Sequence, residues 1–195
     1  MLSHLRPASV SLGLFTLLLG LAYPLAITGI AQTMPQQAGG SLIRAGGHIV
    51  GSELIGQAFA RAEYLHGRPS AAGADGYDAS ASSGSNLGPL NPDLAKRVKD
   101  QADALRAETG ATTIPADAVT TSASGLDPHI SPAYAELQAQ RIATARGVPV
   151  DQVRALITQH VEGRALGFIG QPRVNVLQTN LALDAAYPAR QPSPQ

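Results

Sequence analysis

The chain has 195 residues, with 14 Lys and Arg against 14 Asp and Glu. This length predicts one domain with at most a small appendage. The balanced charge disfavours a nucleic-acid-binding protein, because neutralising phosphates requires a basic excess. The absence of cysteine excludes a disulfide framework, a cysteine nucleophile and a thiolate metal site. Hydrophobic residues make up 44% of the chain but aromatic residues only 4%, which predicts a modestly packed core.

An uncharged stretch near the amino terminus predicts a transmembrane helix. Arg6 and Arg44 bracket a segment without Asp, Glu, Lys, Arg or His, and within it residues 10–31 read VSLGLFTLLLGLAYPLAITGIA. As a helix this run would be about 33 Å long, enough to cross a hydrocarbon core of about 30 Å. We therefore assign residues 1–32 to a short N-terminal end and one membrane-spanning helix.

A cleaved signal peptide is the alternative interpretation of the same segment. Gly29-Ile30-Ala31 before Gln32 has the small-x-small form of a cleavage site, although the apolar run is longer than the roughly 7–15 residues of a signal core. Both interpretations export the rest of the chain. Arg6 precedes the helix and no basic residue lies between Ala31 and Ile43, which favours an N-terminus in the cytoplasm. Residues 33–195 are then expected to be extracytoplasmic.

Small residues recur on one face of the predicted membrane helix. Ser9, Gly13, Thr16 and Gly20 are spaced four, three and four apart, so they share one side. Such a face lets another membrane helix approach closely, which predicts helix packing, although small residues in membrane helices also face lipid without consequence. Pro24 predicts a kink, because its ring clashes with the carbonyl one turn earlier.

The exported residues predict an α+β domain that opens with β structure. A hairpin is expected over residues 42–50, turning at Gly46-Gly47 and continuing through residues 54–55. Residues 68–92, rich in Ser, Gly and Pro, form a connection that is either an ordered functional loop or a flexible one, and the composition favours a flexible one. Residues 114–121 could be a strand or a loop.

Helices are expected to dominate the later half of the chain. Each is bracketed by capping and stop signals. They run from the Asn91 cap to Gly110, from the Ser131 cap to Gly147, from Val150 to Gly163, and from the Asn175 cap through Leu177, Leu181 and Ala185, which are predicted to be buried. The first helix pairs opposite charges four residues apart, at Asp93–Arg97, Lys96–Asp100 and Lys99–Asp103, which indicates a solvated face. Residues 188–195 are expected to be a disordered tail.

One cluster of side chains could carry chemistry. In Asp127-Pro128-His129 the carboxylate could orient the imidazole as a base, but no nucleophile elbow of the Gly-x-Ser-x-Gly type accompanies it. We therefore favour a structural role, in which Asp127 and Ser131 accept backbone N–H bonds and His129 bonds a neighbouring carbonyl. Neither a phosphate loop nor a Gly-x-Gly-x-x-Gly fingerprint is present. The residues thus predict no catalytic site, no metal site and no intrinsic cofactor.

Several longer strings point to a known family. They are Gly51-Ser52-Glu53-Leu54-Ile55-Gly56-Gln57, Gly67-Arg68-Pro69-Ser70, residues 82–89 (SSGSNLGP), residues 122–132 (SASGLDPHISP), Gln138 with Arg141, Gly167-Phe168, and residues 172–177 (PRVNVL). Together with one N-terminal membrane helix, they resemble the KdpC family, the C subunit of bacterial Kdp potassium-transporting P-type ATPases. The resemblance covers nearly the whole chain except the spacer and the tail.

The resemblance implies an accessory subunit of an ATP-driven potassium uptake pump in the bacterial inner membrane. It implies three partners in the lipid bilayer: a channel-like potassium-translocating subunit, a P-type ATPase subunit and a small single-span subunit. ATP, Mg and potassium would act in the complex. The family has also been proposed to act as a catalytic chaperone that raises the ATP affinity of the pump subunit, with a nucleotide contact at the position of Gln138. Asn86, Asp127, His129 and Asn175 would shape loops or partner contacts.

Two functions are therefore carried forward. The favoured one is structural: the small-faced helix packs against partner helices, and the exported domain lies near the outer potassium entrance and stabilises the assembly. The alternative is a membrane-anchored exported enzyme or binding domain that acts alone and is centred on Asp127 and His129.

Overall fold

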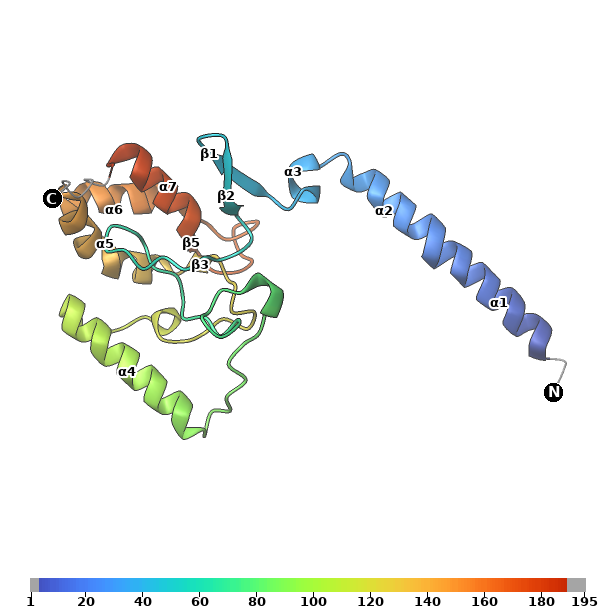
Figure 1. The fold of residues 1–195 in the computed structure, drawn as a ribbon, viewed down its shortest axis with the longest axis horizontal. Helices are drawn as coiled ribbons and strands as arrows, with labels where there is room; N and C mark the ends of the chain where they lie inside the picture. The colour runs from blue at the N-terminus through green and yellow to red at the C-terminus, as the bar shows by residue number, and fades with distance from the viewer. Residues whose placement is uncertain (1–3, 189–195) are drawn as a thin grey trace. The chain divides into compact units, whose positions relative to one another are not determined.

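The computed structural model describes residues 4–188 and contains two compact units, Met1–Ile43 and Arg44–Gln195. The predicted tail, residues 188–195, lies outside the described residues apart from Pro188. The mixture of helices with small sheets confirms the α+β content (Figure 1).

The first unit is dominated by one long apolar helix. It comprises α1 (Leu5–Leu17), the π-helical turn η2 (Leu18–Ala22) and α2 (Tyr23–Ala31), and the short helix α3 (Pro35–Ala38) follows. The 27 residues from Leu5 to Ala31 have a mean hydropathy of 2.0 in their most apolar window, none of which is buried within the chain. By length and composition this helix can cross a membrane, as the sequence predicted, and it begins five residues earlier than expected.

The π-helical turn takes the place of the kink predicted at Pro24. In an α-helix the proline ring would meet the carbonyl of Gly20, four residues earlier. Here the Tyr23 N–H donates to the Leu18 carbonyl, five residues back, so the winding widens immediately before the proline. The helix therefore continues past Pro24 without a sharp break (Figure 1).

The predicted hairpin is present but shorter than expected. Strands β1 (Leu42–Ala45) and β2 (His48–Ser52) form a two-stranded sheet. The turn between them places Gly46 and Gly47 at φ of +57° and +83°, a region that favours glycine. Leu54 and Ile55, predicted to extend the strand, follow it in a turn.

Helix α4 (Pro92–Thr109) confirms the first predicted helix of the domain. The Asn91 side chain accepts from the Asp93 N–H at 2.8 Å, and Gly110 ends the helix at φ +71°. The predicted ion pairs Lys96–Asp100 and Lys99–Asp103 form, at 2.6 and 2.5 Å. The expected Asp93–Arg97 pair is absent from the ion pairs of residues 4–188, because Arg97 lies on the half-buried side of α4.

The segment predicted as a strand or a loop over residues 114–121 contains no strand. It holds a single 3-10 turn, η4 (Ala116–Ala118), whose Ala118 is buried. Pro115 immediately before it cannot donate to a strand ladder, which accounts for the absence of a strand here.

Three helices form the body of the second unit (Figure 1). Helix α5 (Pro132–Arg146) begins at the Ser131 cap and ends at Gly147 with φ +68°, as predicted. Helix α6 (Val150–Gln159) is shorter than predicted: the chain leaves the helix at His160 and enters strand β4 (Val161–Glu162) before Gly163. Helix α7 (Val176–Ala186) starts at the predicted Asn175 cap.

The buried face of α7 differs from the prediction. Leu177 is buried as expected, but Leu181 is half-buried and Ala185 is exposed. The face turned to the interior instead carries two polar side chains, Thr179 and Asn180, which are 0% and 1% exposed. Both side chains have hydrogen-bond partners, which allows them to be buried. A prediction from the apolar periodicity alone therefore assigned the wrong face to the interior.

A small antiparallel sheet late in the chain was not predicted. Its strands are β3 (His129–Ile130), β4 and β5 (Arg173–Asn175), in the order β3-β5-β4. Ile130 and Val161 both face Val174 of the central strand. Strands of two or three residues are too short to give a recognisable alternation.

The core lies where α5, α6, α7 and β5 meet. Ala135, Ala139 and Ile142 of α5 are fully buried, together with Val153 of α6 and Leu183 of α7. The small alanine side chains let the helices approach closely. The core therefore depends on close packing of small residues more than on large aromatic anchors.

Candidate functional site

Arg68 joins three loops of the second unit. Its Nη1 lies 3.2 Å from Oδ2 of Asp127, and its other nitrogens donate to the carbonyls of Thr120 and Thr121 at 3.4 and 3.3 Å. The strings around residues 67–70 and 122–132, distant in the sequence, thus meet at one guanidinium. Arg68 and Asp127 line two adjoining surface hollows of about 530 and 540 Å³.

The serine-rich connection, residues 68–92, is held against this cluster and not left flexible as its composition suggested. The Ser70 hydroxyl donates to the Gly125 carbonyl at 2.6 Å and accepts from the Tyr77 N–H at 2.8 Å. Further along, the Ser83 N–H donates to the Ser124 carbonyl at 3.0 Å. The polar side chains that made the segment resemble a linker are the groups that fix it.

Close backbone approach explains two glycines of these strings. A Cβ at Gly84 would lie 2.9 Å from the Ala123 carbonyl oxygen, and one at Gly125 would lie 2.6 Å from the Ser83 carbonyl oxygen. Gly125 also has a φ of +67°. Only residues without a side chain allow the two loops to pack this closely.

Asp127 is held in its charged form by its neighbours. Burial alone would raise the pKa of its carboxyl group, but hydrogen bonds from the side chain and backbone of His129, with the charge of Arg68, together lower that pKa below its ordinary value. The His129 N–H donates to Asp127 Oδ1 at 3.0 Å. The His129 ring faces carboxylates and not the predicted carbonyl: Nδ1 lies 3.5 Å from Asp127 and Nε2 lies 3.8 Å from Glu162.

The hydroxyl nearest in sequence to this pair is committed to a helix start. Ser131 Oγ donates to Asp117 Oδ1 at 2.9 Å and accepts from the Tyr134 N–H at 3.1 Å. It therefore does not donate to His129, as nucleophilic catalysis by a serine would require. Among residues 4–188, no three His, Asp or Glu side chains are grouped to hold a metal ion. The cluster ties loops together and offers no activated nucleophile.

A second set of polar side chains holds residues 62–66. Five consecutive carbonyls of this segment accept hydrogen bonds from side chains of α5 and α7. The donors are Arg141 to Ala62 and Tyr64, Arg146 to Glu63, Asn180 to Leu65, and Gln138 to His66. The segment is thereby fixed by helix side chains in the way that a strand is fixed by a neighbouring strand.

Gln138 is one of these donors, and it is buried. Its Nε2 donates to the His66 carbonyl at 3.1 Å, and its Oε1 accepts from the His66 N–H at 2.8 Å and from Arg141 Nη2 at 2.6 Å. Gln138 is 3% exposed. A nucleotide contact at Gln138 stays a prediction, and in the structure its polar atoms are engaged within the chain.

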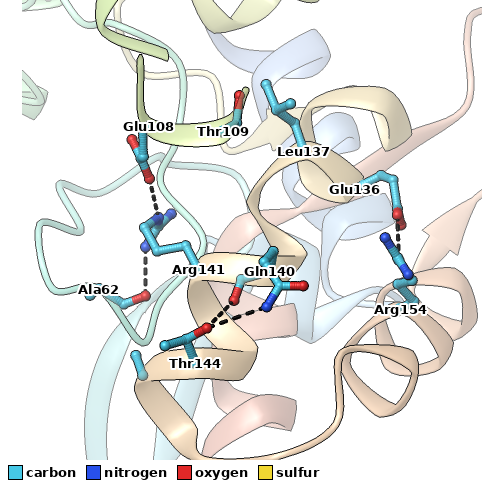
Figure 2. Close-up of a pocket in the computed structure, with 10 residues that line it drawn as sticks. Ala62, Glu108, Thr109, Glu136, Leu137, Gln140, Arg141, Thr144 and Arg154 are labelled. Atoms are coloured by element: carbon cyan, nitrogen blue, oxygen red, sulfur yellow. Dashed lines mark hydrogen bonds and ion pairs between the residues drawn. The ribbon is translucent and has the colours of Figure 1, made fainter. Parts of the chain in front are cut away.

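A hollow on the second unit lies beside this segment (Figure 2). It has a volume of about 700 Å³ and is lined by the end of α4 and by α5 and α6. Its two arginines are already paired: Arg141 Nε lies 3.0 Å from Glu108 and Arg154 Nε lies 2.6 Å from Glu136. Gln138 does not line it. The positive and negative charges that line the hollow therefore balance. Each of its arginines already has an acidic partner, so neither is available to bind a phosphate.

The remaining predicted site residues belong to α1, to η2, to the loop before α4 and to the cap of α7. Asn175 is buried; it caps α7 and its Nδ2 donates to the Glu53 carbonyl at 2.8 Å. Asn86 is exposed and adopts a φ of +53°. Ser9, Gly13 and Thr16 are exposed on α1, and Gly20 lies in the π-helical turn.

Two further anchoring residues were missed by sequence reasoning. Asn180 lies on the buried face of α7. Arg146 has a fully buried side chain that donates to three carbonyls and pairs with Asp184 at 2.9 Å. A basic residue in the last turn of a helix is usually a surface cap. The sequence offered one hint that Arg146 is not a surface residue: no Asp or Glu lies at helical spacing from it.

Comparison with known proteins gives a consistent result. A family model described as "KdpC: K+-transporting ATPase, c chain" matches residues 5–185. A protein from Caulobacter vibrioides, named potassium-transporting ATPase KdpC subunit, is 70% identical over 190 residues, covering 96% of each chain. Proteins with the same name from Beijerinckia indica and Sorangium cellulosum are 64% and 56% identical, covering 98% and 95% of this chain and 98% and 100% of theirs.

Proposed function

Because the chain belongs to the KdpC family, and so is an accessory subunit of a potassium-transporting ATPase, we propose that it acts chiefly by assembling and stabilising that pump. The helix Leu5–Ala31 would anchor it in the bacterial inner membrane, with the N-terminus in the cytoplasm and the second unit outside. The partners are a channel-like potassium-translocating subunit, a P-type ATPase subunit and a small single-span subunit. ATP, Mg and potassium act on those partners.

The observation that carries the structural role is how the polar side chains are used. Gln138, Arg141, Arg146 and Asn180 all bond the backbone of residues 62–66, and Arg68 bonds the loops around Asp127. Buried polar groups that are fully bonded within one chain specify a rigid shape. The second unit is therefore built as a scaffold, suited to holding partners near the outer entrance for potassium.

The membrane helix supplies the second support. No residue of α1, η2 or α2 is buried within the chain, so every face is free to meet lipid or another helix. The small residues Ser9, Gly13 and Thr16 leave room for a partner backbone. Helix packing in the membrane would fix the subunit in the pump, while the second unit contacts the partners outside the lipid.

A role in raising the ATP affinity of the pump subunit has less support from the geometry. The proposed orientation places Gln138 on the opposite side of the membrane from the cytoplasmic ATP pool. Its amide is also bonded to His66 and Arg141. Any effect on ATP affinity would then be indirect, through the shape of the assembled pump.

Membrane orientation is the first property to measure. The chain has no cysteine, so His4→Cys and Leu90→Cys each introduce a single thiol, and both positions are exposed. In intact cells that make the whole pump, an impermeant thiol reagent should label the Leu90 variant and spare the His4 variant until the cells are opened. The reverse pattern would invert the orientation and favour a direct nucleotide role. Position 138 is unsuitable for this test, because Gln138 is buried.

Assembly is tested by leaving the chain out. Without it, the other pump subunits should separate in mild detergent, and expression of the chain from a second plasmid should restore their co-purification. Stable co-purification without the chain would contradict the assembly role.

A further inference from the structure

The turn between β4 and β5 exposes three large apolar side chains within four residues. Leu166, Phe168 and Ile169 are 83%, 72% and 51% exposed. Large apolar side chains are stabilised by removal from water, so three of them exposed on one turn favour burial against a partner. Contiguous exposed apolar surface of this kind marks a contact site more often than isolated exposed residues do.

The turn is a defined structure. Ala165 and Ile169 exchange both backbone hydrogen bonds at 2.9 Å, and the Phe168 N–H also donates to the Ala165 carbonyl at 3.2 Å. These backbone groups are already satisfied, so a partner can enclose the turn without leaving them unbonded. A turn that is ordered before binding also loses little conformational freedom on binding.

Leu166 adds a local strain. Its φ is +53°, a region that a bulky side chain seldom adopts. Gly167 and Gly170 of the same turn have φ of +81° and +83°. The Leu166 side chain is 83% exposed, so it gains little burial from its own chain. Strain of this kind tends to accumulate at binding sites.

The surroundings of the turn distinguish between two kinds of partner. At its base Arg173 Nε pairs with Glu162 at 2.8 Å, and Arg164 Nη2 donates to Gln171 Oε1 at 3.3 Å. An apolar centre inside a polar rim is the anatomy of a protein interface. A turn that binds anionic lipid would instead carry a cluster of Lys or Arg, whereas residues 163–172 contain one basic residue, Arg164.

We propose that the turn of residues 163–172 inserts Leu166, Phe168 and Ile169 into an apolar pocket on another subunit of the same potassium pump. The proposal rests on the assembly role above and extends it by assigning a contact surface.

The test uses the full chain in the assembled pump. Phe168 is replaced by the photo-crosslinking residue p-benzoyl-phenylalanine, which keeps an aromatic ring at this exposed position, and membranes are irradiated. We expect a covalent adduct of this chain with one pump subunit, identified by mass spectrometry. The same residue at Leu90, which is also apolar and is 96% exposed but precedes α4, serves as the matched control and should give no such adduct.

The possible outcomes separate this inference from the proposed function. If the chain co-purifies with the pump but position 168 gives no subunit adduct, the contact is overturned and the assembly role stands. Adducts with lipid alone would overturn it in favour of the bilayer. If the chain does not co-purify with the pump at all, both proposals fail.

A substitution gives a second readout. The double variant Leu166→Ser and Phe168→Ser should reduce the amount of co-purifying pump subunits at least threefold, with an unchanged melting temperature of the chain, since both side chains are exposed. Leu90→Ser should leave co-purification unchanged. Full recovery of the complex with the double variant would overturn the proposal.

Discussion

Asn180 bonds both backbone groups of Leu65. Its Nδ2 donates to the Leu65 carbonyl at 3.0 Å, and its Oδ1 accepts from the Leu65 N–H at 2.7 Å. Gln138 makes the same pair of bonds with the next residue, His66, from a different helix. Successive residues of an extended chain direct their backbone groups to opposite sides, so residues 65 and 66 are held between α5 and α7 by two side-chain amides.

Asn180→Ala should destabilise the second unit strongly. The N–H and carbonyl of Leu65 would lose their partners at a residue that is 0% exposed, at a cost of about 1–3 kcal/mol for each group. A total of about 3 kcal/mol corresponds to a fall in melting temperature of roughly 6–12 °C for a chain of this size. Thermal unfolding of the detergent-solubilised chain would measure it.

Gln140→Ala is the matched control for this change. Gln140 is an exposed amide on α5 with only a 3.4 Å hydrogen bond to Thr144, and its loss should shift the melting temperature by no more than about 2 °C. If the Asn180 variant melted as the control does, the clamp on residues 62–66 would not be a source of stability.

Gln138→Ala distinguishes a structural from a nucleotide-binding role. The structure predicts a lower melting temperature without any nucleotide, because both backbone groups of His66 and the Arg141 guanidinium lose a partner. Gln138→Glu should fall between wild type and Gln138→Ala, since a carboxylate still accepts from the His66 N–H and Arg141 but cannot donate to the carbonyl. A variant with unchanged melting but an altered ATP dependence of the pump would support direct nucleotide contact instead.

The local signals of the sequence predicted the elements that depend on local chemistry. Asn91, Ser131 and Asn175 were identified as helix caps and each accepts a backbone N–H in the structure. The long apolar helix was predicted because an apolar run without charges is typical of a segment that can cross a bilayer. Both kinds of signal are contained within a few neighbouring residues or one continuous segment.

Contacts between distant segments were not predictable in this way. Asn180 and Arg146 are polar residues on helices, and nothing local indicates that their partners lie in residues 62–66. Residues 68–92 looked like a linker because serine and glycine favour flexibility, yet Ser70 and Ser83 bond the loop around residues 124–125. Tertiary hydrogen bonds thus override composition where a complementary backbone is present.

Stability should fall as the pH is lowered through the range of His66. Burial, and then the nearby charge of Arg141, lower the pKa of its imidazole, against the opposing effects of the Arg61 carbonyl and Glu108. Since the folded-state pKa lies below the unfolded value of about 6.5, the unfolded chain takes up the proton first, so stability is retained above that value and declines below it.

His66→Gln removes this titration. The melting temperatures of wild type and variant should differ by the same amount at pH 7.5 and at pH 8.5, where the histidine is neutral in both the folded and the unfolded state. Between pH 6.5 and 5 the melting temperature of wild type should fall more steeply than that of the variant. Parallel curves throughout the acid range would show that His66 does not contribute to acid sensitivity.

Gly13→Leu tests the small face of the membrane helix. Apart from the adjoining backbone of its own helix, a Cβ at Gly13 meets no atom within 4 Å. A loss of co-purification would therefore come from contact with a neighbouring molecule. If a partner helix packs on Ser9, Gly13 and Thr16, the isobutyl group separates the backbones and weakens the complex. We expect the pump subunits to dissociate from this variant in detergent concentrations that wild type withstands.

Ser11→Leu supplies the control for that experiment. Ser11 lies two residues from Gly13, about 200° around the helix, and it is also small and exposed, so the substitution adds a similar volume to the opposite face. It should leave co-purification unchanged. Equal co-purification with the two variants would contradict the proposed packing face. Loss of the pump subunits with Gly13→Leu alone, and a greater loss when Gly20→Leu is added, would locate the membrane contact of this subunit on that side of α1.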